Sequence, residues 1–321
     1  MSDSTITAQV WELPGRLWQL RPEACGLLTA LNERVWQAGD PVLLELVRVR
    51  VAQLIGNPVP VRARAPASPA EQDVVDLTEQ FVIDVGGTTK EMRAGLTARF
   101  GADGARDLVT AVYVVEFTQR LQLIAARLLG DAVAVADSVA VTGLSAAAGV
   151  LAAAGLSAAA DASPAGLLDA YQAAVVRGST LDAVTTELVR LRCARTHHCR
   201  ICQTLRLADA RAAGVDETMT AKVDFYERSD LPERAKLALR VTDAFITRPD
   251  LLSDAMAGQA RASFGPDELA SLSLDITKWS TQKIKVTLGT DGADRLVTDA
   301  DGVALFGFDP EGQAAGFRRR P

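Results

Sequence analysis

A sequence segment that occurs twice is the feature that most constrains how this chain folds. Residues 45–52, ELVRVRVA, return as ELVRLRCA at residues 187–194, and GLLTA at residues 26–30 returns as GLLDA at residues 166–170. Two shorter matches follow downstream in the same order, namely Pro69–Glu71 with Pro232–Glu233 and Arg99–Asp103 with Ser263–Asp267. Because a repeated sequence usually encodes a repeated structural unit, we expect two copies of one unit in tandem.

The spacing of apolar residues inside both copies is helical. Leucines and valines recur at steps of three and four residues, as on one face of a helix, and no strand-like alternating run of useful length occurs. The pattern comprises Leu43, Leu44, Leu46, Val47, Val51 and Leu54, and then Leu188, Val189 and Leu191. A chain of 321 residues exceeds what one hydrophobic core usually holds. We therefore predict an all-α fold of two tandem helical-bundle repeats.

Four segments are expected along the chain. Residues 1–135 hold the first repeat, residues 136–160 a connector rich in Ala, Gly and Ser, residues 161–290 the second repeat, and residues 291–321 a loosely held polar tail. The uncharged stretch Ser138–Ala160 is long enough to cross a bilayer. Its small residues and glycines give a weak transfer free energy, so we expect a connector or a buried helix there.

Charge and the first residues narrow the possible functions. The net charge is −6, from 34 basic and 40 acidic residues, and no long basic run occurs. Such a chain lacks the basic surface patch that binding to the phosphate backbone of a nucleic acid requires. The first residues, MSDSTIT, have neither the positive start nor the apolar run of a secretory signal. We expect a cytoplasmic protein that binds neither nucleic acid nor membranes.

The cysteines are clustered in the second repeat. Cys193, Cys199 and Cys202 lie within ten residues, and Cys25 stands apart. A cytosolic chain of this size needs no disulfide framework, so the cluster indicates redox catalysis or metal binding. Cys199 and Cys202 are one helical turn apart, close enough to form a disulfide. We expect a break in the helix near Thr196. If the second helix begins there, Thr196 can cap it, and the unpaired amides and dipole of its first turn favour a thiolate at Cys199.

Three further residues complete the predicted site. Arg206 follows Cys202 by four residues, on the same face of the expected helix, where its charge would stabilise a thiolate. Glu187 precedes Cys199 by twelve residues, about 18 Å along an unbroken helix. The two therefore meet only if the chain folds back at the break. The carboxylate would then accept the thiol proton directly, through water or through His198.

A structural role is the alternative for the glutamate. Glu187 is spaced to pair with Arg190 one turn along its helix. Glu45 lies in the same local sequence, although Asn57 and Pro60 stand where the second repeat has its two cysteines. The first repeat therefore lacks the thiol pair, and a glutamate at this position can serve packing alone.

The thiol pair also has alternatives. The two sulfurs can act as small buried hydrophobes. They can also bind zinc together with His197 and His198, since both ligand types are suitable. However, three consecutive ligands hardly converge on one tetrahedral ion, and the sequence offers no second ligand pair. We therefore expect no metal ion and no cofactor.

The spacing of Glu187, Cys199 and Cys202 resembles that of a known superfamily, the alkyl hydroperoxidase D-like and carboxymuconolactone decarboxylase proteins. Its redox members carry Glu, eleven residues, Cys-x-x-Cys, three residues and a His. The resemblance continues downstream in the second half and has a counterpart in a degenerate first half. It covers Leu231–Arg234, Phe245, Asp267, Glu268 and Trp279–Gly289, and in the first half Phe117–Arg120.

The resemblance implies an all-helical homo-oligomer whose dithiol reduces hydroperoxides or disulfides, or exchanges electrons with a protein thiol such as a peroxiredoxin. It makes Cys202 the more reactive thiol, whereas the helix dipole favours Cys199, and the assignment stays open. Arg206 occupies the place of the relay His in the family pattern. Either His198 replaces that histidine, or peroxidase activity is weak or absent.

We therefore predict a thiol-disulfide oxidoreductase or peroxidase of the alkyl hydroperoxide reductase type, with antioxidant activity and one site per chain. The site residues are Glu187, His198, Cys199, Cys202 and Arg206. A non-catalytic oligomeric binding or assembly protein with the same fold is the first alternative. A decarboxylase like the name-giving enzyme is the second, although that branch of the superfamily lacks the Cys-x-x-Cys pair.

Overall fold

The computed structural model describes residues 13–58, 64–131, 163–294 and 296–318. The expected connector, residues 136–160, lies outside the described residues. The part before it consists of helices, as predicted: α1 (Gly15–Leu20), α2 (Pro22–Ala38), α3 (Pro41–Ile55), α4 (Pro69–Ile83), the 3₁₀ turn η1 (Val85–Gly87) and α5 (Lys90–Leu129). Gly101 breaks the regular course of α5, because its φ of 73° is one that glycine adopts without strain.

The part after the connector begins with α7 (Pro164–Gly178) and α8 (Ala183–Thr196). Short elements follow: α9 (Arg200–Thr204), β1 (Leu205–Leu207), α10 (Ala208–Ala212), α11 (Glu217–Ala221) and η2 (Lys222–Arg228). The chain continues with α12 (Glu233–Ile246), η3 (Pro249–Leu251), α13 (Asp254–Ser263), α14 (Pro266–Trp279), α15 (Gln282–Leu288), β2 (Ala304–Phe308) and β3 (Ala314–Ala315). The predicted all-α class is confirmed, with one small sheet added.

Side-chain caps fix where the helices of the repeated segments begin. The Asp40 carboxylate accepts from the amide of Val42 at the start of α3, and the Asp182 carboxylate accepts from the amide of Thr185 at the start of α8, both at 2.8 Å. Such caps satisfy amides that have no partner inside the helix. α3 and α8 therefore both begin with an aspartate cap. The duplication itself stays a prediction.

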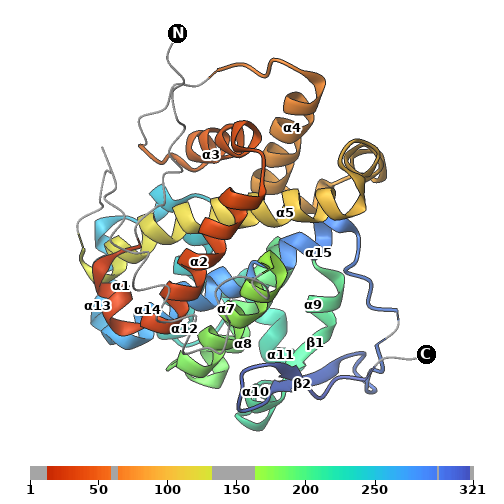
Figure 1. Ribbon diagram of the computed structural model, residues 1–321. Coiled ribbons are helices and arrows are strands. Elements are labelled where there is room, and N and C mark those ends of the chain that lie inside the picture. Colours follow the sequence, from red (N-terminus) through yellow and green to blue (C-terminus); the bar gives the residue numbers. More distant parts are fainter. Residues whose placement is uncertain (1–12, 59–63, 132–162, 295, 319–321) are drawn as a thin grey trace.

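The two halves share one hydrophobic core. Figure 1 shows α5 crossing the middle of the molecule, with α3 and α4 on one side and α7, α8 and α15 on the other. α5 packs against α14 and α15, and α2 packs against α7. The buried carboxylate of Glu116 in α5 binds Arg120 at 2.8 Å and Lys283 in α15 at 2.7 Å. The second half of the chain is therefore held by contacts with the first half.

The chain after α15 departs from the sequence expectation. β2 pairs in parallel with β1, with Leu205 opposite Ala304, and β3 pairs antiparallel with β2. Phe306 is buried against the main core. The expectation of a loosely held tail was therefore wrong for these residues. The strands are too short to show a sequence pattern, and they form only because distant segments meet.

None of the helices in the described part of the chain is both long enough and apolar enough to span a membrane. The stretch that raised this question, Ser138–Ala160, lies outside the described residues.

Candidate functional site

The chain breaks near Thr196, as expected, but the helix after the break begins later than expected. Thr196 is the last residue of α8 and caps no following helix. The chain then turns at His198, which has a φ of 56°, and Cys199 is the N-cap residue of α9. The prediction that Thr196 caps the second helix was wrong. The amide of Arg200 donates to the Asp291 carboxylate at 3.0 Å, so a side chain from beyond α15 already binds this helix start.

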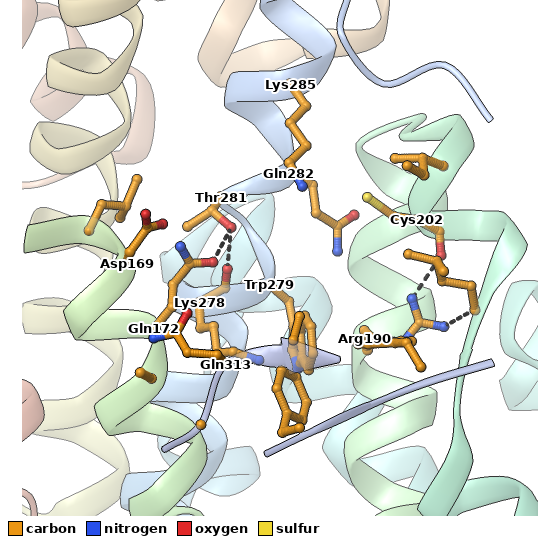
Figure 2. A pocket seen from close by; sticks show the side chains of 18 of the residues that line it. Asp169, Gln172, Arg190, Cys202, Lys278, Trp279, Thr281, Gln282, Lys285 and Gln313 are labelled. Atoms are coloured by element: carbon orange, nitrogen blue, oxygen red, sulfur yellow. Dashed lines mark hydrogen bonds between the residues drawn. The ribbon is translucent and has the colours of Figure 1, made fainter. Parts of the chain in front are cut away.

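The two cysteines are joined, as their spacing predicted. Cys199 and Cys202 form a disulfide with a Cα–Cα distance of 5.3 Å. Cys199 is fully buried. Cys202 is 7% exposed and lines a cavity of about 360 Å³, shown in Figure 2. Cys199 is not among the residues that line this cavity. A molecule in the cavity would therefore meet Cys202 first.

Glu187 reaches the thiol segment through an arginine. Its buried carboxylate accepts from Nε and Nη2 of Arg190 at 2.6 and 2.7 Å. Nη1 of Arg190 donates to the carbonyl oxygen of Cys202 at 2.7 Å, and Nη2 also donates to the carbonyl of Leu205. The chain does fold back at the break, so that α8 and α9 lie against each other. Arg190, which lines the cavity, links the carboxylate to the backbone of Cys202.

The same pair recurs in the first repeat with a different environment. Glu45 accepts from Nε of Arg48 at 2.6 Å. The side chain of Glu45 is 38% exposed, whereas that of Glu187 is 1% exposed. The ion pair expected as the structural alternative for Glu187 is therefore present. It does not by itself exclude a role in proton transfer.

Of the five predicted site residues, Cys202 lines the cavity, and Glu187, His198, Cys199 and Arg206 do not. His198 is exposed and packs on η1, where a Cβ added to Gly86 would come within 2.8 Å of its ring. Arg206 lies in β1, and its Nε and Nη2 donate to Glu217 at 3.0 and 2.7 Å. The expectation that Arg206 shares a helical face with Cys202 was wrong, because α9 ends at Thr204.

Comparison with known proteins bears on the half that carries the disulfide. Residues 164–223 match the model of the carboxymuconolactone decarboxylase family. This segment contains Glu187, Arg190 and both cysteines.

The chain belongs to the carboxymuconolactone decarboxylase family.

Relatives match it over most of its length. Two uncharacterized proteins of Mycobacterium tuberculosis, Rv2313c of strain ATCC 25618 / H37Rv and MT2376 of strain CDC 1551 / Oshkosh, are each 34% identical to it over 279 residues. The aligned region covers 84% of this chain and 93% of each relative. No solved structure matches the chain.

The other walls of the cavity come from α7, α14, α15 and the chain after α15. Of these, only α7 lies within the segment that the family model matches. Figure 2 shows Cys202 and Arg190 on one side of the cavity and Asp169 and Gln172 on the other, with Trp279 between them. The predicted site contained none of the lining residues of α14 and α15. The sequence signal available for this wall was the single cation of α14, which stands among apolar, hydroxyl and acidic side chains.

That cation is Lys278. Its side chain is 3% exposed and lines the cavity, and Nζ lies 3.2 Å from the ring centroid of Trp279. Burial lowers the pKa of the Lys278 ammonium well below its ordinary value of 10.5, toward neutrality. The same burial raises the pKa of Asp275, which lies three residues earlier in α14. The cavity of this family member therefore holds a base that the sequence motif does not include.

The zinc alternative has no geometric support in the described residues. Among them, no three His, Cys, Asp or Glu side chains are placed to hold a metal ion. His197 is buried and lines a different cavity, together with residues of α4 and α12. Burial lowers the pKa of the His197 ring well below its ordinary value.

Proposed function

We propose that this chain is a thiol-disulfide oxidoreductase whose Cys199–Cys202 pair opens and closes during turnover, with hydroperoxides as oxidants. The observation that carries the proposal is the position of Cys202, which is bonded to Cys199 and also lines a cavity of about 360 Å³. A purely structural disulfide would gain nothing from a cavity at one of its sulfurs. Membership of the carboxymuconolactone decarboxylase family is consistent with the proposal.

The reaction that we propose is a two-electron exchange. In the reduced protein, the thiolate of Cys202 attacks the hydroperoxide, so that an S–O bond forms, the O–O bond breaks and an alcohol leaves after taking up a proton. The thiol of Cys199 then attacks the Cys202 sulfenic acid, the disulfide forms and water leaves. An external dithiol, small or on a partner protein, reduces the disulfide and is itself oxidised.

We assign roles by distance from Cys202. Arg190 donates to the Cys202 carbonyl, and its permanent charge favours the thiolate form of that residue. In this proposal it takes the role first given to Arg206. Glu187, bonded to Arg190, is the proposed acceptor of the thiol proton. The relay role of His198 stays a prediction.

Turnover of tert-butyl hydroperoxide with dithiothreitol as reductant tests the proposal. We expect Cys202→Ser to reduce the rate to that of the solution without protein. Cys193→Ser is the matched control, because Cys193 is a buried free cysteine in the same repeat, and its activity should equal that of the wild type. An Arg190→Met variant should be slower than Arg206→Met. Full activity in Cys202→Ser would refute the proposal.

One observation favours a second candidate, a non-catalytic binding or assembly protein. Glu187 and Arg190 form the same ion pair as Glu45 and Arg48, which have no thiols to serve. If the pair is structural in both repeats, the cysteines of the reduced protein should react with a chromogenic disulfide no faster than free cysteine at neutral pH. A faster reaction at Cys202 excludes this candidate.

A further inference from the structure

Two hydrogen-bond donors in the cavity wall have no acceptor in the protein. Nζ of Lys278 and Nε1 of Trp279 are buried, and neither meets a hydrogen-bond partner among the residues that the structure describes. The two side chains are 3% and 9% exposed, and both line the cavity that contains Cys202. Buried polar groups are normally hydrogen-bonded, since an unpaired one destabilises the fold. A pair of open donors in one cavity indicates that a ligand supplies the acceptors.

The neighbouring charges do not occupy these donors. Arg190 uses its guanidinium on Glu187 and on backbone carbonyls. Asp275, the acid nearest to Lys278 in α14, accepts from the hydroxyl of Ser179 at 3.2 Å, and no ion pair joins it to Lys278 in the described part of the chain. Lys278 therefore remains the buried cation of this cavity with an open donor.

The rest of the wall is largely apolar. Nζ of Lys278 is 4.3 Å from the ring centroid of Phe308, and the guanidinium carbon of Arg190 is 6.0 Å from the ring centroid of Trp279. Further apolar side chains of the wall are Leu168, Ile201, Leu205, Ile284, Phe306 and Phe317. Polar groups come from Asp169, Gln172, Thr281, Gln282, Lys285 and Gln313. Such a surface suits a molecule with an apolar body and a group that accepts two hydrogen bonds.

We propose that Lys278 and Trp279 bind the carboxylate of an apolar organic acid inside the cavity that contains Cys202. A carboxylate has two acceptor oxygens for the two donors, and its charge makes the hydrogen bond with an ammonium a strong one. The identity of the substrate rests on the proposed function, because the bound acid is then the molecule that reacts at Cys202. The substrate class is then a carboxylic acid that bears a hydroperoxide group.

Octanoate and octanamide are suitable probes, because both have an eight-carbon body and only one carries a charge. Isothermal titration calorimetry on the oxidised full-length chain should show that octanoate binds more tightly than octanamide. Lys278→Met should weaken octanoate binding roughly tenfold to a hundredfold, the loss expected for one hydrogen bond to a charged group. Trp279→Phe, which keeps a ring and loses the donor, should weaken it less.

Lys285→Met is the matched control. Lys285 lines the same cavity but is exposed, so a general positive field would make both lysine variants lose affinity equally. The proposal requires that Lys285→Met bind octanoate like the wild type, whereas Lys278→Met does not. It is overturned if wild type does not bind octanoate, if octanamide binds as tightly, or if Lys278→Met binds octanoate like wild type. Because Lys278→Met replaces a buried ammonium with an apolar side chain of similar size, the variant is expected to fold.

The pH dependence of binding gives a second readout. Burial disfavours the charged form of Lys278, and a bound carboxylate restores it, so octanoate affinity should fall as pH rises above neutrality. In Lys278→Met the affinity should be constant over this range. The charged groups that act on Lys278 are Asp275 from α14 and Arg190 from α8, and Asp169 from α7 and Lys285 from α15 line the same cavity. The same fall in Lys278→Met would assign the effect to one of them and overturn the proposal.

The binding experiment separates this inference from the proposed function. Cys202→Ser should bind octanoate like wild type, because Cys202 is not a ligand of the carboxylate. Inactive cysteines together with octanoate binding that depends on Lys278 would refute the redox function and keep the carboxylate site. Active cysteines together with octanoate binding that Lys278→Met leaves unchanged would refute the carboxylate site and keep the redox function.

Discussion

Glu187→Gln removes one charge from an ion pair that is shielded from water. The side chains of Glu187 and Arg190 are each 1% exposed, and the carboxylate accepts two hydrogen bonds from the guanidinium. The variant keeps the shape of the side chain but leaves Arg190 as a buried cation without its counter-charge. Because a buried charge that loses its partner cannot be resolvated, we expect the free energy of unfolding to fall by about 3–5 kcal/mol.

Glu45→Gln is the matched control within the same chain. Glu45 occupies the corresponding place in ELVR and pairs with Arg48, but its side chain is 38% exposed. Water reaches the Glu45 carboxylate, although Arg48 is itself only 5% exposed, so we expect a smaller loss of roughly 1 kcal/mol or less. Two substitutions of the same chemistry should therefore differ several-fold in their effect on stability.

Urea unfolding followed by circular dichroism at 222 nm measures both losses. With an m value of about 3 kcal/mol/M, Glu187→Gln should lower the urea midpoint by about 1–1.7 M, and Glu45→Gln by about 0.3 M or less. The double variant Glu187→Gln with Arg190→Met should recover part of the loss, because it removes the unpaired charge. Equal losses in the two single variants would refute the reasoning from burial.

Three further outcomes are expected. Glu116→Gln leaves both Arg120 and Lys283 buried without an anion, and thermal unfolding should show a loss of about 3–5 kcal/mol or more. Burial lowers the pKa of Lys283 to about 8, so the unfolded chain binds more protons than the folded chain between pH 8 and 10.5. The free energy of unfolding of the wild type, measured by urea titration against Lys283→Met, should therefore rise over this range. A fall would contradict the assignment. Burial raises the pKa of the Cys193 thiol to about 12, so iodoacetamide should label Cys202 of the reduced protein well before Cys193 in peptide mass spectrometry.

The helical class and the thiol pair were predictable because their signals are local. Apolar residues at three- and four-residue steps specify the buried face of a helix wherever it packs, and α3 and α8 form as expected. The Cys-x-x-Cys spacing alone brings Cys199 and Cys202 within disulfide reach. The family followed from the distance between Glu187 and these cysteines along the chain.

The start of the helix after the break was not predictable to within a few residues. A left-handed turn at His198 and a carboxylate from Asp291, more than ninety residues away, decide where α9 begins. Likewise, Arg206 left the expected helical face because β1 pairs with β2. Local sequence favours a longer helix here, and contacts from the end of the chain override it.

The sequence by itself determined the helices, the family and the two sulfurs, because each depends on residues close together along the chain. Only the tertiary structure decided what surrounds Cys202. It placed Arg190 on the carbonyl of that residue, buried Lys278 and Trp279 in the opposite wall and used Phe306 to close the cavity. The physical reason is that a cavity is formed by side chains from distant segments, and no spacing in the sequence records which of them meet.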